Sequence, residues 1–142
     1  MSTIVAIASA VAESLNGTNF TMPFTAARLY RPMFTLADLA GLQVTVVPRA
    51  NDETAADRAR SQNDYQIDVA VQKKLVTGST DEIDPLMALV EEIQTHFRRS
   101  RLAAYPEAAW IKAVNEPAYV PEHIDQHKVF TSVVTLTYRV LG

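Results

Sequence analysis

The clearest pattern in the sequence is an alternation of apolar and polar residues near the C-terminus. Residues 129–140 are rich in β-branched and aromatic side chains, which favour an extended strand. One side of this strand carries Val134, Leu136, Tyr138 and Val140, and the other carries Val133, Thr135, Thr137 and Arg139. Residues 65–73 alternate equally well, with Tyr65, Ile67, Val69 and Val71 on the inward side. Both stretches are predicted to be strands of one sheet with a single core face.

The first residues have the spacing of an amphipathic helix. Ile4, Ala8, Val11 and Leu15 recur at helical intervals, and Asn16-Gly17 provides a C-terminal stop. A signal peptide is the alternative, because residues 3–12 are apolar and end in small side chains. That alternative lacks a positively charged start, since no Lys or Arg precedes Arg28.

A second helix is predicted to begin after Ser79. Ser79 and Glu82 have the spacing of a capping box, and acidic residues follow at the positive end of the helix dipole. The apolar face consists of Ile83, Leu86, Met87, Val90, Ile93 and Phe97, and the C-terminal end carries Arg98, Arg99 and Arg101.

Shorter elements complete the predicted fold. Further strands are expected over residues 24–30, 42–47 and 110–115, the first ended by Arg31-Pro32 and the second by Pro48. Thr35 is expected to cap a short turn over 36–40, and residues 116–128 form a loop with room for a turn of helix. The order is α-β-β-β-α-β-β over one domain, residues 1–142. This order predicts an α+β fold with two layers: a mostly antiparallel sheet of four or five strands and two helices.

The segment 49–64 differs from the rest because it contains no apolar residue larger than alanine. It is predicted to be a long exposed loop joining two strands that pair as a hairpin. Its charges have both signs: Arg49, Asp52, Glu53, Asp57, Arg58 and Arg60. A connection of this length in a compact domain is usually functional or disordered.

Composition narrows the classes of function. The net charge of −3 argues against a protein that grips phosphate backbones. The absence of cysteine excludes a disulfide framework and thiolate zinc sites. No run approaches the roughly 20 apolar residues of a membrane span, so a soluble chain without membrane partners is expected.

No catalytic, metal-binding or cofactor-binding residue is predicted. His123 and His127 have the spacing of two metal ligands on one helix face. A zinc protease needs Glu immediately after the first His, and Ile124 stands there. Two surface histidines are therefore expected, and a metal site is the alternative. His96 is expected at the boundary of the second helix. The sequence has no GxSxG, P-loop or GxGxxG motif, and an enzyme is not expected.

Four stretches together resemble structural proteins of phages and prophages. They are VTVVPR at 44–49, YQIDVAVQKK at 65–74, LMALVEEI at 86–93 and FTSVVTLTYRV at 130–140. Within that group the chain most resembles the tail terminator, or tail completion, proteins of long-tailed phages. The resemblance covers the chain from about position 24 to the end and brings no catalytic residues.

The resemblance implies a virion protein that assembles in the host cytoplasm. Such subunits form a homo-oligomeric ring, commonly a hexamer, between the tail tube protein and the head–tail connector or stopper protein. The genome DNA passes through the ring without specific binding. In such a ring, the charged residues of 49–64 are expected to form an assembly interface, mobile in the free subunit and ordered on assembly. A solvated hairpin tip without a partner is the alternative.

Two other functions remain open at this stage. One is a different neck component, such as a head-completion or stopper protein, whose rings are commonly of twelve. The other is a small ligand-binding or enzymatic α+β domain. The mass of the oligomer that the chain forms in solution distinguishes the tail terminator from these two alternatives.

Overall fold

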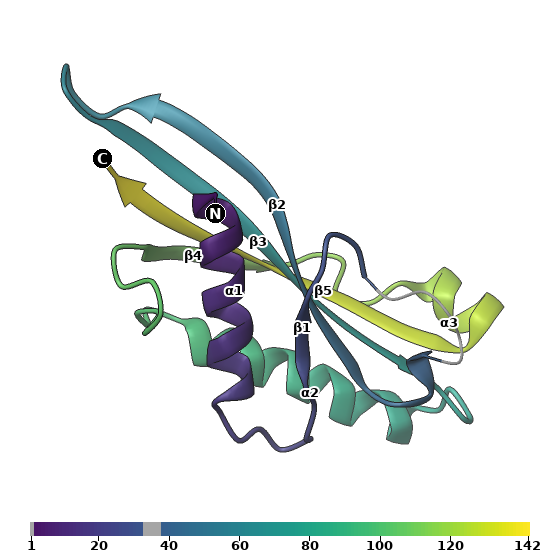
Figure 1. Cartoon of the computed structure of the whole chain (residues 1–142). Coiled ribbons are helices and arrows are strands. Elements are labelled where there is room, and N and C mark those ends of the chain that lie inside the picture. The colour runs from purple at the N-terminus through teal and green to yellow at the C-terminus, as the bar shows by residue number, and fades with distance from the viewer. Residues whose placement is uncertain (1, 33–37) are drawn as a thin grey trace.

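The computed structural model describes residues 2–32 and 38–142, and Figure 1 shows its elements along the chain. These are α1 (Thr3–Asn16), β1 (Ala26–Arg28), the 3₁₀ helix η1 (Asp38–Ala40), β2 (Gln43–Ala55), β3 (Ser61–Lys74), α2 (Thr80–Phe97), β4 (Ala109–Asn115), α3 (Pro121–His127) and β5 (Val129–Leu141). The α+β class and both predicted helices are confirmed. A third helix, α3, lies in the segment 116–128, which was predicted as a loop with room for a turn of helix. Thr35 lies outside the described residues, and η1 is the described part of the turn expected there.

The five strands form one mixed sheet in the order β1-β2-β3-β5-β4. β1 runs parallel to β2, and every other neighbouring pair is antiparallel. The two strands with the clearest alternation, β3 and β5, lie side by side in the centre, with Ile67 opposite Leu136. Their alternation is strong because one face of each strand meets the core while the other does not.

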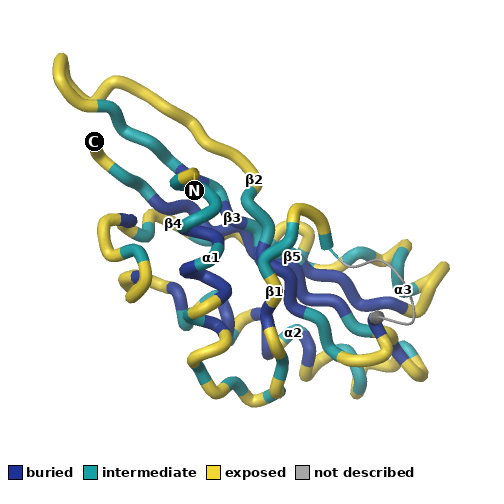
Figure 2. Tube along the Cα trace, in the orientation of Figure 1, coloured by how far each residue is buried: buried dark blue, intermediate teal, exposed yellow. Residues whose placement is uncertain are grey.

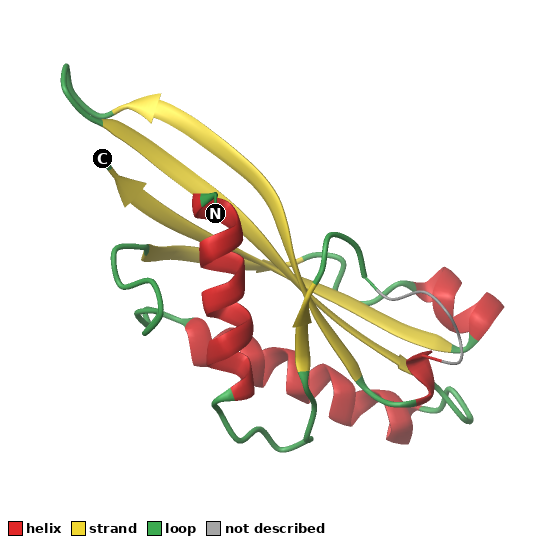
Figure 3. Ribbon diagram, viewed as in Figure 1, coloured by secondary structure: helices red, strands yellow, loops and turns green. Residues whose placement is uncertain are grey.

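The core lies between the sheet and the two longer helices, which cover the same face (Figure 3). Ile67, Val134 and Leu136 are completely buried there. They meet Ile7, Val11 and Leu15 from α1 and Leu86, Ile93 and Phe97 from α2 in one apolar cluster. Full burial of such a side chain stabilises the fold by about 1.5 to 3 kcal/mol, so this face holds the two layers together.

β2 is longer than predicted, because Pro48 does not end it. The strand continues to Ala55, and the register shifts between Pro48 and Ala50. Proline is tolerated on edge strands and at bulges, where its missing N–H breaks no ladder. The expected strand over 24–30 is shorter, since only Ala26–Arg28 pairs with β2.

The start of α2 also differs in one respect from the expected capping box. Ser79 is the N-cap, but its side chain makes no capping hydrogen bond. The Glu82 carboxylate instead accepts hydrogen bonds from the backbone N–H groups of Val76, Thr77 and Gly78, at 2.7, 2.9 and 3.0 Å. These bonds favour the ionised form and lower the pKa of Glu82 to about 2. Glu82 therefore ties the β3–α2 connection to the first turn of the helix.

Candidate functional site

The distal part of the β2–β3 hairpin projects beyond both long helices, and its β2 strand and turn are exposed (Figures 1 and 2). We call residues 49–64 the hairpin arm. The prediction of an exposed hairpin is correct, but the predicted long loop is wrong: Asn51 pairs with Tyr65 and Ala55 with Ser61, which leaves a turn over residues 56–60. The arm has no apolar alternation because neither of its faces meets the core. The arm is held by backbone pairing between its strands and not by burial of side chains.

β5 extends the arm to three strands. Gln62 pairs with Leu141, and Ser61 exchanges backbone hydrogen bonds of 2.8 and 3.0 Å with Gly142. The C-terminal residues therefore support β3 along the whole arm, which consists of paired strands in the single subunit. That this segment becomes ordered only on assembly stays a prediction.

Two of the predicted interface residues stabilise the turn at the tip of the arm. Asp57 Oδ1 accepts hydrogen bonds from the backbone N–H groups of Ala59 (2.8 Å) and Arg60 (2.9 Å). The Arg60 guanidinium lies 3.0 Å from Asp57 Oδ2. The backbone N–H of Ala59, followed by the Arg60 side chain, lowers the pKa of Asp57. Asp57 and Arg60 thus satisfy each other locally.

A third predicted residue, Arg49, lies at the base of the arm and bridges strands. Its Nη1 donates to Thr135 Oγ1 at 3.1 Å and lies 3.6 Å from Asp68 Oδ1. The Thr135 hydroxyl donates in turn to Asp68 Oδ1 at 2.7 Å. Arg49 therefore links β2 to β3 and β5.

The other three predicted residues are Asp52, Glu53 and Arg58. All three are exposed, and none of their side chains has a hydrogen bond or ion pair with another described residue. Their charges are therefore not neutralised by the described part of the subunit. Of the six predicted residues, these three are the ones available to a partner.

An ion pair that sequence reasoning missed lies beside them. Arg139 Nε donates to Asp64 Oδ1 at 2.8 Å, and Arg139 Nη2 donates to Asp64 Oδ2 at 3.2 Å. The hydrogen bond from Arg139 lowers the pKa of Asp64, with a smaller contribution from the charge of Lys112. The partners are 75 residues apart in the sequence, so only the strand register brings them together.

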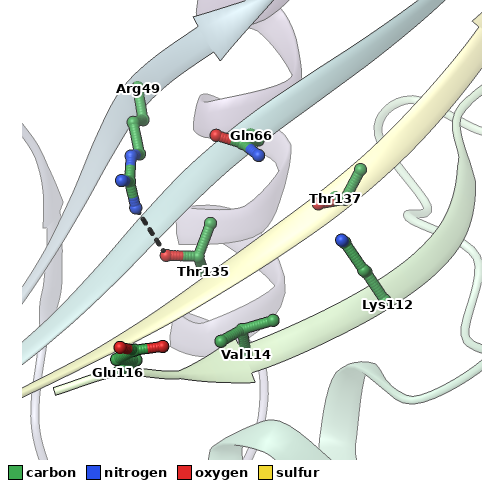
Figure 4. A pocket seen from close by; sticks show the side chains of 7 residues that line it. All are labelled: Arg49, Gln66, Lys112, Val114, Glu116, Thr135 and Thr137. Atoms are coloured by element: carbon green, nitrogen blue, oxygen red, sulfur yellow. Dashed lines mark hydrogen bonds between the residues drawn. The ribbon is translucent and has the colours of Figure 1, made fainter.

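The sheet face opposite α1 carries a polar groove, shown in Figure 4 with α1 behind the strands. Its volume is about 420 Å³, and it is lined by Arg49, Gln66, Lys112, Val114, Glu116, Thr135 and Thr137. Thr135 and Thr137 form part of its floor and are largely buried. Small-molecule pockets are mostly apolar, so a groove with this lining is better suited to polar contact with a macromolecule.

The histidines have structural contacts. His123 lies 2.8 Å from Thr131 Oγ1 and joins α3 to β5, whereas His127 is exposed. His96 is half-buried, as expected for a boundary position, and lies 2.9 Å from Ser14 Oγ on α1. Its burial lowers the pKa of His96. Among the described residues, no group of three or more His, Cys, Asp or Glu side chains could hold a metal ion.

The fold is similar to that of a chain in the virion of a native gene transfer agent (GTA) particle. The two chains are 14% identical with a TM-score of 0.60, and the similarity covers 99% of this chain and 100% of the other. A chain of an extracellular contractile injection system, the PVC sheath/tube terminator in its extended state, is 15% identical with a TM-score of 0.47. In that case 99% of this chain and 57% of the other are covered. At such identities the likeness concerns the fold.

Sequence comparison adds no family assignment. No protein-family model and no curated protein matches the chain. Within residues 2–32 and 38–142, no helix combines the length and the apolar character needed to cross a membrane.

Proposed function

We propose that this chain is a non-enzymatic structural protein of a phage-like particle, a tail terminator at the junction between the tail tube and the head connector. The observation that carries the proposal is the likeness in fold to a chain of a gene transfer agent virion. That likeness covers 99% of this chain and 100% of the other, so it concerns whole subunits and not one shared motif.

The surface of the subunit supports an assembly role. The hairpin arm carries three exposed charged side chains without partners among the described residues: Asp52, Glu53 and Arg58. Beside the arm lies the polar groove, with cationic and anionic side chains around a threonine floor. Polar surfaces of this kind give specificity and register to contacts between subunits.

In the proposed particle, copies of the chain form a closed ring, commonly a hexamer. One side of the ring contacts the tail tube protein, and the other contacts the head–tail connector or stopper protein. Genome DNA passes through the ring without specific binding, in keeping with the net charge of −3. The subunit is made in the host cytoplasm and ends in the neck of the virion.

The proposal is tested by disrupting the gene in the cell that produces the particles and examining the products by electron microscopy. We expect heads and tails that fail to join, and restoration of complete particles when the chain is supplied from a plasmid. Normal complete particles from the disrupted strain contradict the proposal.

The mass of the purified chain gives an independent test. The proposed ring has six times the mass of the 15.7 kDa chain. Twelve copies would favour a head-completion or stopper protein, and a monomer or dimer would favour a small ligand-binding domain.

A further inference from the structure

Two edges of the sheet lack a neighbouring strand within the described part of the chain. β1 covers β2 only at Val44, Thr45 and Val46, so from Pro48 to Ala55 the strand pairs with β3 alone. At the other end of the sheet order, β4 pairs with β5 alone. An uncovered edge presents unpaired N–H and C=O groups and is a template for another strand.

The two uncovered edges lie at the same level of the sheet. Following the register across the strands, Asp52 lies opposite Asp64, Asp64 opposite Arg139, and Arg139 opposite Ala109. Following the register in the same way from Ala50 across the sheet leads to Lys112 on β4. The uncovered part of β2 and the whole of β4 therefore span overlapping levels.

The strand directions also match. β2 and β3, β3 and β5, and β5 and β4 are all antiparallel, so β4 runs opposite to β2. If a second copy with the same orientation is placed beside the first, its β2 lies antiparallel to the β4 of the first. In an antiparallel pair the backbone hydrogen bonds run perpendicular to the strands, and the pairing is slightly more stable per residue than a parallel one.

The charges of the two edges are complementary. The β2 edge carries the unpartnered Asp52 and Glu53. Beside β4 are the exposed Arg99 and Arg101, which line one hollow together with Ala109 and Trp110, and the exposed Lys112 is on β4 itself. Glu107 precedes this end of β4, whereas Asp84, Glu91 and Glu116 lie near its far end at Asn115. Cations are therefore in excess at the end of β4 that lies at the level of Asp52.

We propose that the β2 edge of each subunit, residues 50–55, adds antiparallel to β4 of a second copy of this chain. This inference rests on the proposed ring and specifies how it closes. Two different patches meet in a head-to-tail contact, which generates a ring when the rotation closes. Asp52 and Glu53 disfavour pairing of two β2 edges by like-charge repulsion, which selects β4 as the partner. The sheet then continues from subunit to subunit.

Disulfide cross-linking tests this contact cleanly, because the chain has no cysteine. A cysteine in place of Ala109 is combined with one at Ala50, Asp52 or Thr54, which belong to the same side of β2. After mild oxidation we expect at least one pair to give a ladder of covalent multimers up to the full ring. The matched control combines Ala109→Cys with Val76→Cys, a position that is 80% exposed and lies on neither edge, and it should stay monomeric in a denaturing gel.

The outcomes separate this inference from the function on which it rests. A ring of the unmodified chain in solution with no ladder from any of the three pairs refutes edge pairing and leaves the proposed function standing. An unmodified chain that is monomeric overturns both.

Charge exchange provides a second measurement that does not depend on cysteine geometry. Asp52→Lys should shift the mass of the purified protein in solution from that of the ring to that of the monomer. Adding Lys112→Asp to the same chain should restore much of the ring. Asp125→Lys makes the same charge change at an exposed position on α3, which belongs to neither edge, and should leave the ring mass unchanged. Equal effects of Asp52→Lys and Asp125→Lys would falsify the pairing.

Discussion

Asp64 on β3 and Arg139 on β5 form a two-point ion pair, with Nε 2.8 Å and Nη2 3.2 Å from the two carboxylate oxygens. Arg139 lowers the pKa of Asp64 from its ordinary value of 3.8. A carboxylate with a lowered folded-state pKa stabilises the fold above its unfolded-state pKa, and this contribution is lost as pH falls through the folded-state pKa. Asp64→Asn should therefore cost up to about 1 kcal/mol at pH 7, and the difference should close below about pH 4.

Urea unfolding of both proteins between pH 7 and pH 3 measures this difference. The matched control is Asp52→Asn, because Asp52 lies directly opposite Asp64 but has no ion pair among the described residues. It should cost nothing, since it removes a like charge from a cross-strand pair. Equal losses in the two variants would show that the Asp64–Arg139 pair contributes no specific stability.

Glu82→Gln should lower the melting temperature of the subunit at neutral pH. The amide cannot replace a carboxylate that accepts three backbone N–H bonds from Val76, Thr77 and Gly78. Because the pKa of Glu82 is about 2, the effect should persist at pH 4 and vanish only near pH 2. Asp81→Asn, which makes the same charge change in the same helix turn, is the control. If both variants melt alike, net charge and not the hydrogen bonds explains the effect.

Truncation in the core should be far more costly than truncation on the outer strand. Leu136→Ala and Ile93→Ala remove side chains that are completely buried, and each should destabilise the fold by about 2 to 5 kcal/mol. Val114→Ala, at a position 40% exposed, should cost less than about 1 kcal/mol. Chemical denaturation gives all three values. An unchanged free energy of unfolding for both core variants would contradict the packing of α2 and β5.

Shortening the arm should separate folding from assembly. Replacing residues 53–63 by Asn-Gly joins Asp52 to Asp64, which are already paired, so the register is kept. The removed side chains lie outside the apolar core, and the subunit should melt close to the unmodified protein. The yield of infectious particles should fall strongly. A normal yield would exclude an assembly role for the arm, and an unfolded subunit would show that the arm belongs to the folding core.

The sequence predicted those elements whose side chains meet the core. β3, β5 and α2 each have one apolar face, so periodicity locates them well. The distal part of β2 has no such face, and its strand conformation depends on pairing with β3. α3 begins at Pro121, a residue suited to the first turn of a helix, but it contributes no buried residue that could reveal it by spacing.

The composition of the sequence predicted where the candidate site lies, but it did not predict the contacts that its residues make. The mixed charges of 49–64 pointed to the arm, yet the sequence could not distinguish Asp57, whose side chain is bound within the turn, from Asp52, whose side chain has no described partner. The Asp64–Arg139 pair and the basic β4 edge depend on strand order and register. Local sequence patterns do not encode either of these.

The position of this chain in purified particles tests the central claim most directly. Antibodies raised against the subunit, followed by gold labelling and electron microscopy, locate it without altering the protein. A tail terminator should be labelled only where the tail meets the head, on intact particles and on one end of isolated tails. Label along the tail, at its distal tip or over the head shell, or particles free of label, would contradict the account.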